Sequence, residues 1–236
     1  MSFRKIDTKR LFYKKWLYKI VIESKGLGHL HRSNCADQLL SRPPEAPLDN
    51  RWGSAIIYDR RKDVWNNRKD LLNLTAFLEL TLTDKDFQTR YESDNVSIFT
   101  NDVQLVDTIS VGVNTFVKEI HRPHNDEEAL FLSSNKNKVI CTALPHEKFR
   151  YKLYFKDGNR PSSSFLNSFL TWTNKFNDGR IHIPDGTRRI LAGNAYPYFY
   201  GHYFYAKDQK IASMAMLYVG EHLHKTEEFI LKDEIA

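Results

Sequence analysis

Two His-Leu-His triplets are the residues of this chain whose type and spacing could do chemistry. The first lies in "LGHLHRSN" at His29 and His31, and the second in "GEHLHKT" at His222 and His224. Histidines two apart on a strand point the same way and can chelate a metal. The first triplet, however, falls in a glycine-containing loop without a nearby acidic ligand. The second ends a predicted helix, where histidine offsets the helix dipole. We expect no metal and no cofactor.

The motifs of several common enzyme classes are missing from the sequence. The segment "SKGLGH" (24–29) lacks the Gly-Lys-Ser/Thr ending of a phosphate-binding loop. There is also no Gly-x-Ser-x-Gly and no Gly-x-Gly-x-x-Gly. We therefore expect a protein that binds its partner without catalysing a reaction on it.

Positive charge is concentrated near the N-terminus. The 236 residues carry a formal net charge of +6, with 41% hydrophobic and 27% charged residues, which is an ordinary globular composition. Between residues 4 and 19 a single acid, Asp7, faces seven basic residues. These form the basic arm: Arg4, Lys5, Lys9, Arg10, Lys14, Lys15 and Lys19. Such a segment favours a polyanion or an acidic protein surface as its partner.

Cysteine usage and hydropathy place the chain in a cellular compartment. Cys35 and Cys141 are too few for a disulfide framework, and no Cys-x-x-Cys is present. No run of 18 apolar residues is present, and no apolar segment follows the basic N-terminus. The sequence thus predicts a cytoplasmic protein with reduced thiols and no membrane contact, or one located in the host cell if the protein is viral.

The order of predicted elements repeats along the chain. The strands "YKIVIE" at residue 18 and "YKLYFK" at residue 151 match in character until the last position. The expected elements after the first are a helix over 66–80, two strands within 88–102, a helix over 102–112 and a strand over 114–120. Those after the second are a helix over 163–176, strands over 179–184 and within 196–208, a helix over 209–221 and a strand over 225–233. Both halves read β-α-β-β-α-β.

This pattern predicts an α+β protein of two tandem ferredoxin-like units. The first unit spans residues 1–122 and carries a large insertion at about 24–64, and the second spans 138–236. A turn-rich linker at 121–137 separates them. The alternative is a single α+β domain with one mixed sheet.

Alternation along the strands predicts which side chains face away from the helices. In the first unit Val96 and Ile98 point inward, and Ser97 and Phe99 point outward. In the second unit the outward set is Lys152, Tyr154, Lys156, Tyr203 and Tyr205. Lysines attract phosphates and aromatic rings stack on bases, so this set favours nucleic acid.

We interpret the chain as a non-catalytic protein that binds single-stranded nucleic acid, RNA rather than DNA. The basic arm and the aromatic sheet face would form its contacts. An alternative from another class is an assembly subunit of a larger complex, viral or phage in origin. In that case the aromatic faces contact proteins, the arm contacts an acidic neighbour, and oligomers are expected.

A third interpretation starts from four side chains that follow the first predicted strand: Lys25, His29, His31 and Tyr58. In length and in its two tandem units, the chain resembles the CRISPR repeat-associated RNA-processing proteins. The resemblance implies metal-independent RNA cleavage, with a histidine of this region and Tyr or Lys transferring protons. The glycine-rich loop near that family's C-terminus has no counterpart in "VGEHLHK".

Overall fold

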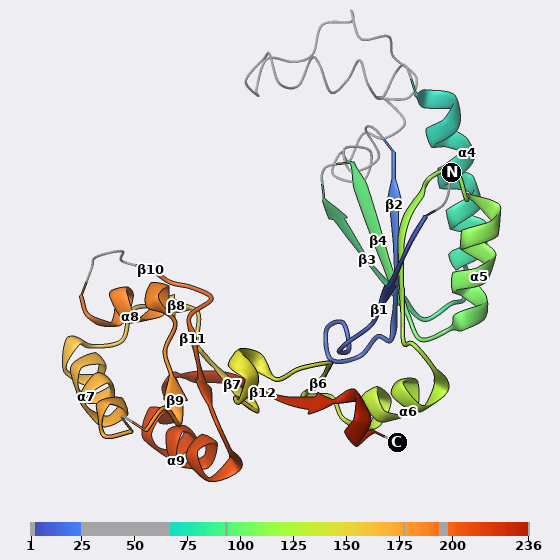
Figure 1. The fold of residues 1–236 in the computed structure, drawn as a ribbon. Coiled ribbons are helices and arrows are strands. Elements are labelled where there is room, and N and C mark those ends of the chain that lie inside the picture. The colour runs from blue at the N-terminus through green and yellow to red at the C-terminus, as the bar shows by residue number, and fades with distance from the viewer. Residues whose placement is uncertain (1–2, 25–66, 93, 177, 194–197, 236) are drawn as a thin grey trace, which may run out of the picture. The chain divides into compact units, whose positions relative to one another are not determined.

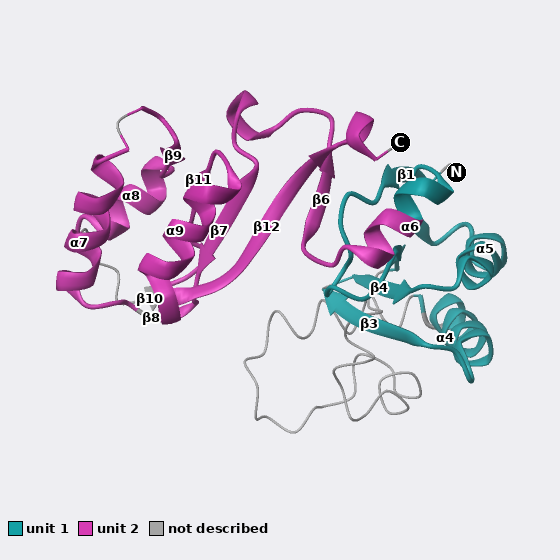
Figure 2. Ribbon diagram, turned by 90° about the horizontal axis from the view of Figure 1, so that it is seen from below, with its two compact units in different colours: residues 1–129 teal, residues 130–236 magenta. Residues whose placement is uncertain are grey.

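The computed structural model describes residues 3–24, 67–92, 94–176, 178–193 and 198–235 (Figure 1). The chain divides into two compact units, residues 1–129 and 130–236 (Figure 2). Each unit contains one five-stranded mixed sheet and its own helices, so the described residues form two main sheets rather than one mixed sheet. The candidate catalytic residues Lys25, His29, His31 and Tyr58 lie outside the described residues, with nearly all of the expected insertion.

The described residues of unit 1 form five strands and two helices. They are β1 (Arg4–Asp7), β2 (Tyr18–Glu23), α4 (Arg68–Leu82), β3 (Phe87–Glu92), β4 (Asn95–Thr100), α5 (Val103–Gly112) and β5 (Val117–Arg122). The strand order in the sheet is β1-β5-β2-β4-β3. β1 runs parallel to β5, and the other neighbours are antiparallel.

The core of unit 1 lies between the sheet and its two helices. Alternate residues of β2, among them Ile20 and Ile22, are fully buried with Ile98 of β4. They pack with Leu71 of α4 and Ile109 of α5, and both helices lie on one side of the sheet (Figure 1). Periodicities of two in the strands and three to four in the helices produce this single apolar layer.

Unit 2 has more elements, and the first of them spans the division between the units. They are α6 (Asp126–Ser134), β6 (Lys138–Cys141), a turn at Pro145–Glu147, β7 (Tyr151–Phe155), β8 (Gly158–Asn159), α7 (Ser163–Asn174), β9 (Ile181–His182), α8 (Asp185–Leu191), β10 (Tyr198–Phe199), β11 (Tyr203–Ala206), α9 (Gln209–Val219) and β12 (Leu223–Leu231), with short turns at Gly220–His222 and Lys232–Glu234. The main sheet has the order β6-β12-β7-β11-β9, and β8 pairs with β10 separately.

Aromatic rings dominate the core of unit 2. Phe155 of β7, Phe169 of α7 and Phe204 of β11 contact one another with ring centroids 5.2–5.4 Å apart. All three are at most 2% exposed. Truncating one such buried ring to alanine costs about 3–5 kcal/mol, so this cluster anchors the helices to one face of the sheet.

The two units share strand order, strand direction and local detail. In each, a short edge strand (β1 or β6) runs parallel to the last strand, and the matching segments "YKIVIE" and "YKLYFK" form the central strands β2 and β7. Asp102 caps α5 by accepting a hydrogen bond from the Leu105 amide at 3.1 Å. Asp208 caps α9 in the same way, from the Ile211 amide at 2.9 Å.

The structure corrects one sequence prediction and adds detail to another segment. The expected linker at 121–137 contains the end of β5 and the helix α6, because Asn125 caps the helix through the Glu128 amide and acids in the first turn suit its N-terminus. The basic arm is folded: it begins with β1, makes a turn closed by a bridge between Phe12 and Trp16, and ends in β2.

Candidate nucleic-acid interface

Unit 2 presents a group of tyrosines and lysine on the face of its sheet away from the helical core. We call Lys152, Tyr154, Tyr203 and Tyr205 the tyrosine–lysine face. Register brings them together, because Tyr203 pairs with Tyr154 and Tyr205 pairs with Lys152 across β11 and β7. The residues that alternate with them, such as Leu153 and Phe204, are fully buried on the other face. All four side chains of the tyrosine–lysine face are half-buried.

The Lys152 ammonium lies among the three rings. Its Nζ is 3.7 Å from the Tyr203 ring centroid, 4.6 Å from that of Tyr154 and 5.8 Å from that of Tyr205. The rings also contact one another, with centroids 5.4 Å apart for Tyr203 and Tyr205 and 5.8 Å for Tyr154 and Tyr203. Cation–π contact of this kind stabilises the ammonium and fixes the rings before any ligand arrives.

The neighbouring strand β12 adds charge to this face. The Tyr154 hydroxyl donates to Glu227 Oε2 at 2.7 Å, and Lys225 Nζ lies 2.9 Å from Glu227 Oε1. Lys225 also lies 4.3 Å from the Tyr154 ring centroid. The Glu227 side chain is only 9% exposed, so this carboxylate is partly shielded from solvent. Two ammonium groups against one carboxylate leave the face net positive.

Burial raises the pKa of the Tyr205 phenol. Desolvation, followed by the proximity of Tyr203, raises it to about 12. The phenol is a neutral hydrogen-bond donor at neutral pH, as an ordinary tyrosine is, and the shift extends this state to more alkaline pH. It can donate to a phosphate or base oxygen without adding negative charge to the face.

The equivalent face of unit 1 is covered: Ser97 and Phe99 point away from the helices, as predicted, but they are buried. They are 3% and 4% exposed. The segment between β1 and β2 lies over them: the Phe12 and Tyr13 rings contact Phe99 with centroids 5.5 and 5.0 Å apart. Trp16, also buried, donates from Nε1 to Gln88 Oε1 at 3.0 Å. Alternation predicted the correct face but not its cover.

Part of the basic arm is engaged within unit 1. Arg4 lies 3.9 Å from Glu119, Lys15 lies 3.1 Å from Asp86 and Lys19 lies over the Phe99 ring. Most of the arm is exposed, with Lys19 half-buried. Within the described residues no ion pair engages Lys5, Lys9 or Lys14, whereas Arg10 does have an interaction. These three exposed lysines are the cations best placed for a polyanion.

One more residue that the sequence predicted for this face, and four that it did not predict, lie near the tyrosine–lysine face. Lys156 follows the end of β7, is exposed, and donates its amide to the His222 carbonyl. Lys225 and Glu227 were missed, although alternation in the predicted last strand could have indicated them. His146 and His182 were also missed. Their rings contact Tyr205 with centroids 5.4 and 6.1 Å away, and no local sequence signal connects residues so far apart.

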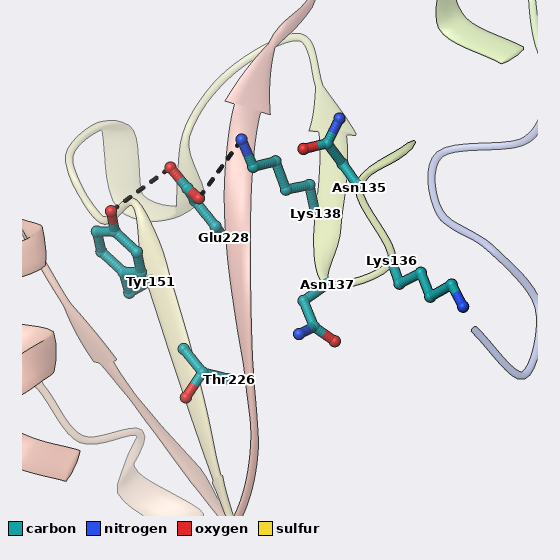
Figure 3. Close-up of a pocket in the computed structure, with 7 residues that line it drawn as sticks. All are labelled: Asn135, Lys136, Asn137, Lys138, Tyr151, Thr226 and Glu228. Carbon is teal, nitrogen blue, oxygen red and sulfur yellow. Dashed lines mark hydrogen bonds and ion pairs between the residues drawn. The ribbon is translucent and has the colours of Figure 1, made fainter. Parts of the chain in front are cut away.

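A separate hollow of about 340 Å³ opens beside β6, β12 and β7 (Figure 3). Its lining is polar: Asn135, Lys136, Asn137, Lys138, Tyr151, Thr226 and Glu228. Glu228 accepts from the Tyr151 hydroxyl at 3.4 Å and lies 3.9 Å from Lys138. Tyr151 lies on the same side of β7 as Leu153, so the hollow opens on the opposite side of the sheet from the tyrosine–lysine face.

Among the described residues there is no group of three or more His, Cys, Asp or Glu placed to hold a metal ion. No helix in the same part of the chain is long and apolar enough to cross a membrane. Comparison of the chain with protein-family models, with curated proteins and with solved structures gives no match.

Proposed function

We propose that the protein binds single-stranded nucleic acid, RNA in particular, on the tyrosine–lysine face of unit 2. The observation that carries the proposal is one lysine ammonium held among three half-buried tyrosine rings on two central strands. Rings offer stacking surfaces to unpaired bases, and the lysines attract the phosphates between them. Stacking of this kind stabilises a complex by about 1–3 kcal/mol per base.

We infer in addition that each unit is ferredoxin-like. The strand order without the edge strand is β5-β2-β4-β3 in unit 1 and β12-β7-β11-β9 in unit 2. Numbered within the repeat, both read 4-1-3-2, which is the order of a split β-α-β arrangement. Sheets of this kind in RNA-recognition domains stack bases on aromatic residues of their strands, and β7 and β11 supply the rings here.

The exposed lysines of the basic arm, Lys5, Lys9 and Lys14, would add phosphate contacts. Each phosphate neutralised on a single strand contributes about −0.7 to the slope of log K against log salt. The proposal therefore includes a steep salt dependence, to which unit 1 contributes charge and unit 2 contributes both stacking and charge.

Fluorescence anisotropy with a labelled single-stranded RNA of about 12 nucleotides tests the proposal. The wild-type protein should bind at low salt, and the double variant Tyr203→Ala/Tyr205→Ala should bind at least about tenfold more weakly. Lys210→Ala, an exposed lysine of α9 on the helical side, serves as the matched control and should bind normally. Circular dichroism melting shows whether each variant is folded.

Three results would overturn the proposal. One is no retention of RNA at low salt. Another is normal binding by a folded double tyrosine variant. The third is equal competition by polyglutamate, which offers charge without bases and would favour an acidic protein partner. Light scattering on the same samples would reveal self-association, the result expected of an assembly subunit.

A further inference from the structure

Two histidines and a tyrosine meet at one corner of the tyrosine–lysine face. His146, from the turn before β7, and His182, from β9, have ring centroids 4.3 Å apart. The Tyr205 ring lies 5.4 Å from His146 and 6.1 Å from His182. His146 is exposed and His182 is half-buried, so a ligand can reach both imidazoles. Phe149 closes the back of the corner, 2% exposed and 5.7 Å from His182.

In the described part of unit 1 the same corner is present without histidines. Its turn carries Tyr13, which contacts Phe99 edge-on as His146 contacts Tyr205. Gln88 pairs with Phe99 as His182 pairs with Tyr205. Both turns also place two successive residues at positive φ: Tyr13 and Lys14 in unit 1, and His146 and Glu147 in unit 2.

Comparing the two corners distinguishes the turn conformation, which both units share, from the histidines of unit 2. The unusual backbone of the turn occurs in both units, so it belongs to the architecture rather than to chemistry. Among the described residues, histidines occupy this corner only in unit 2, where His146 and His182 take the places of Tyr13 and Gln88 in unit 1.

Charged neighbours from the turn before β7 and from α8 bear on the His182 imidazole. Burial lowers the pKa of His182, and the charge of His146 lowers it further, as do Arg188 and Lys148, whereas Asp185 opposes the change. His182 is therefore neutral at pH 7. Tyr205, with its pKa raised to about 12, stays protonated beside the pair.

We propose that His146 and His182 cleave RNA bound on the tyrosine–lysine face by general acid–base catalysis. Neutral His182 accepts the proton of a ribose 2′-hydroxyl as the 2′-oxygen bonds to the adjacent phosphorus. The bond from phosphorus to the 5′-oxygen breaks, and protonated His146 donates its proton to that oxygen. The products are a 2′,3′-cyclic phosphate and a 5′-hydroxyl end, and no metal or other reactant is consumed.

The position of the corner suits this step. The two rings are close enough for both to reach oxygens of one phosphodiester. Tyr205 contacts both histidines and the Tyr203 ring, so a base stacked on this face places its own phosphate near the imidazoles. This inference rests on the proposed RNA binding, but an experiment can disprove cleavage without disproving binding.

Incubation of the whole protein with a 5′-labelled RNA in EDTA tests the proposal. The labelled product should end in a 2′,3′-cyclic phosphate, and a matched oligonucleotide with one 2′-deoxyribose should resist cutting at that position. His146→Gln and His182→Gln should each slow cleavage at least about 100-fold while anisotropy still detects RNA binding. His224→Gln, an exposed histidine of β12, is the control and should cut normally.

The rate should also rise and then fall with pH, because the base must be neutral and the acid protonated. Loss of the acidic limb in His182→Gln would identify the base. RNA that is bound but stays intact from pH 5 to pH 8 would overturn this inference and leave RNA binding standing. Absence of binding would overturn the proposed function itself. Equal cutting by the folded histidine variants, or cutting at the 2′-deoxy position, would also sink the cleavage mechanism.

Discussion

The two units have the same strand order, but the sheet faces that point away from their helices differ in burial. Register aligns Lys19, Val21, Ser97 and Phe99 of unit 1 with Lys152, Tyr154, Tyr203 and Tyr205 of unit 2. In unit 1 the segment between β1 and β2 covers these residues with Phe12, Tyr13 and Trp16. In unit 2 the corresponding turn covers only one corner, through His146 and Phe149. One copy of the face is a second core, and the other remains accessible.

The largest expected effect of this difference is on stability. Phe99→Ala removes a ring that is 4% exposed between Phe12 and Tyr13, and we expect it to lower the free energy of unfolding by about 3–5 kcal/mol. Tyr205→Ala, at the aligned but half-buried position, should cost clearly less and should weaken RNA binding instead. Urea unfolding with anisotropy on both variants measures the contrast. Equal destabilisation by the two would mean that the unit 2 face is also core.

The sequence correctly predicted which residues lie on these sheet faces, but not which segment buries the face of unit 1. Alternation at residues 96–99, 151–155 and 203–205 correctly identified the residues that face away from the helices, because the strand period is strictly two. Whether such a residue is exposed depends on a segment elsewhere in the chain. Phe12 and Trp16 meet Phe99 and Gln88 only after folding. For the same reason the histidine corner, formed by residues 146, 182 and 205, could not be predicted.

Helical segments were predicted where their apolar stripe was strong. The helices at 66–80, 102–112 and 163–176 correspond to α4, α5 and α7, since each repeats apolar residues every three to four positions. α6 was read as a linker because three acids fill its first turn and turn-forming residues precede it, and β1 was read only as positive charge. Short edge elements depend on the neighbour with which they pair, which local sequence does not reveal.

A second contrast concerns the two aligned lysines. Lys152 lies 3.7 Å from its nearest ring centroid on the open face, whereas Lys19 lies 5.9 Å from Phe99 on the covered one. We expect Lys152→Met to weaken RNA binding about tenfold, because it removes a phosphate contact and loosens the rings. Lys19→Met should change binding less than about threefold. Anisotropy at one fixed salt concentration compares them, and a larger loss from Lys19→Met would reverse the assignment of the binding face to unit 2.

The two helix caps are equivalent in the two units, so we expect equal effects when they are removed. Asp102→Ala and Asp208→Ala should each lower the free energy of unfolding by about 1 kcal/mol, since each removes one hydrogen bond to a helix N-terminus. The hydrogen bond from the Leu105 amide has the largest effect on the pKa of Asp102 and lowers it. Burial, the next largest effect, opposes this change, and Lys85 adds to the lowering. A carboxyl group whose pKa is lower in the folded state stabilises the fold at pH values above its unfolded-state pKa. This stabilisation is lost as the pH falls through the folded-state pKa. Asp102→Ala should therefore cost less at low pH, and an unchanged cost in acid urea unfolding would contradict the charged cap.

Substitutions in the basic arm should have the smallest effect on stability. Their effect on binding should appear mainly in its salt dependence. Lys5, Lys9 and Lys14 are exposed lysines without ion pairs among the described residues of unit 1. Changing all three to Gln should alter the free energy of unfolding by less than about 0.5 kcal/mol. If each contacts a phosphate, the slope of log K against log salt should become shallower by about 2, since each contact on a single strand contributes about 0.7. The tyrosine variants should weaken binding at every salt concentration while leaving this slope in place. If the triple lysine variant kept the wild-type slope, unit 1 would take no part in RNA binding, and the open face of unit 2 would have to account for all of it.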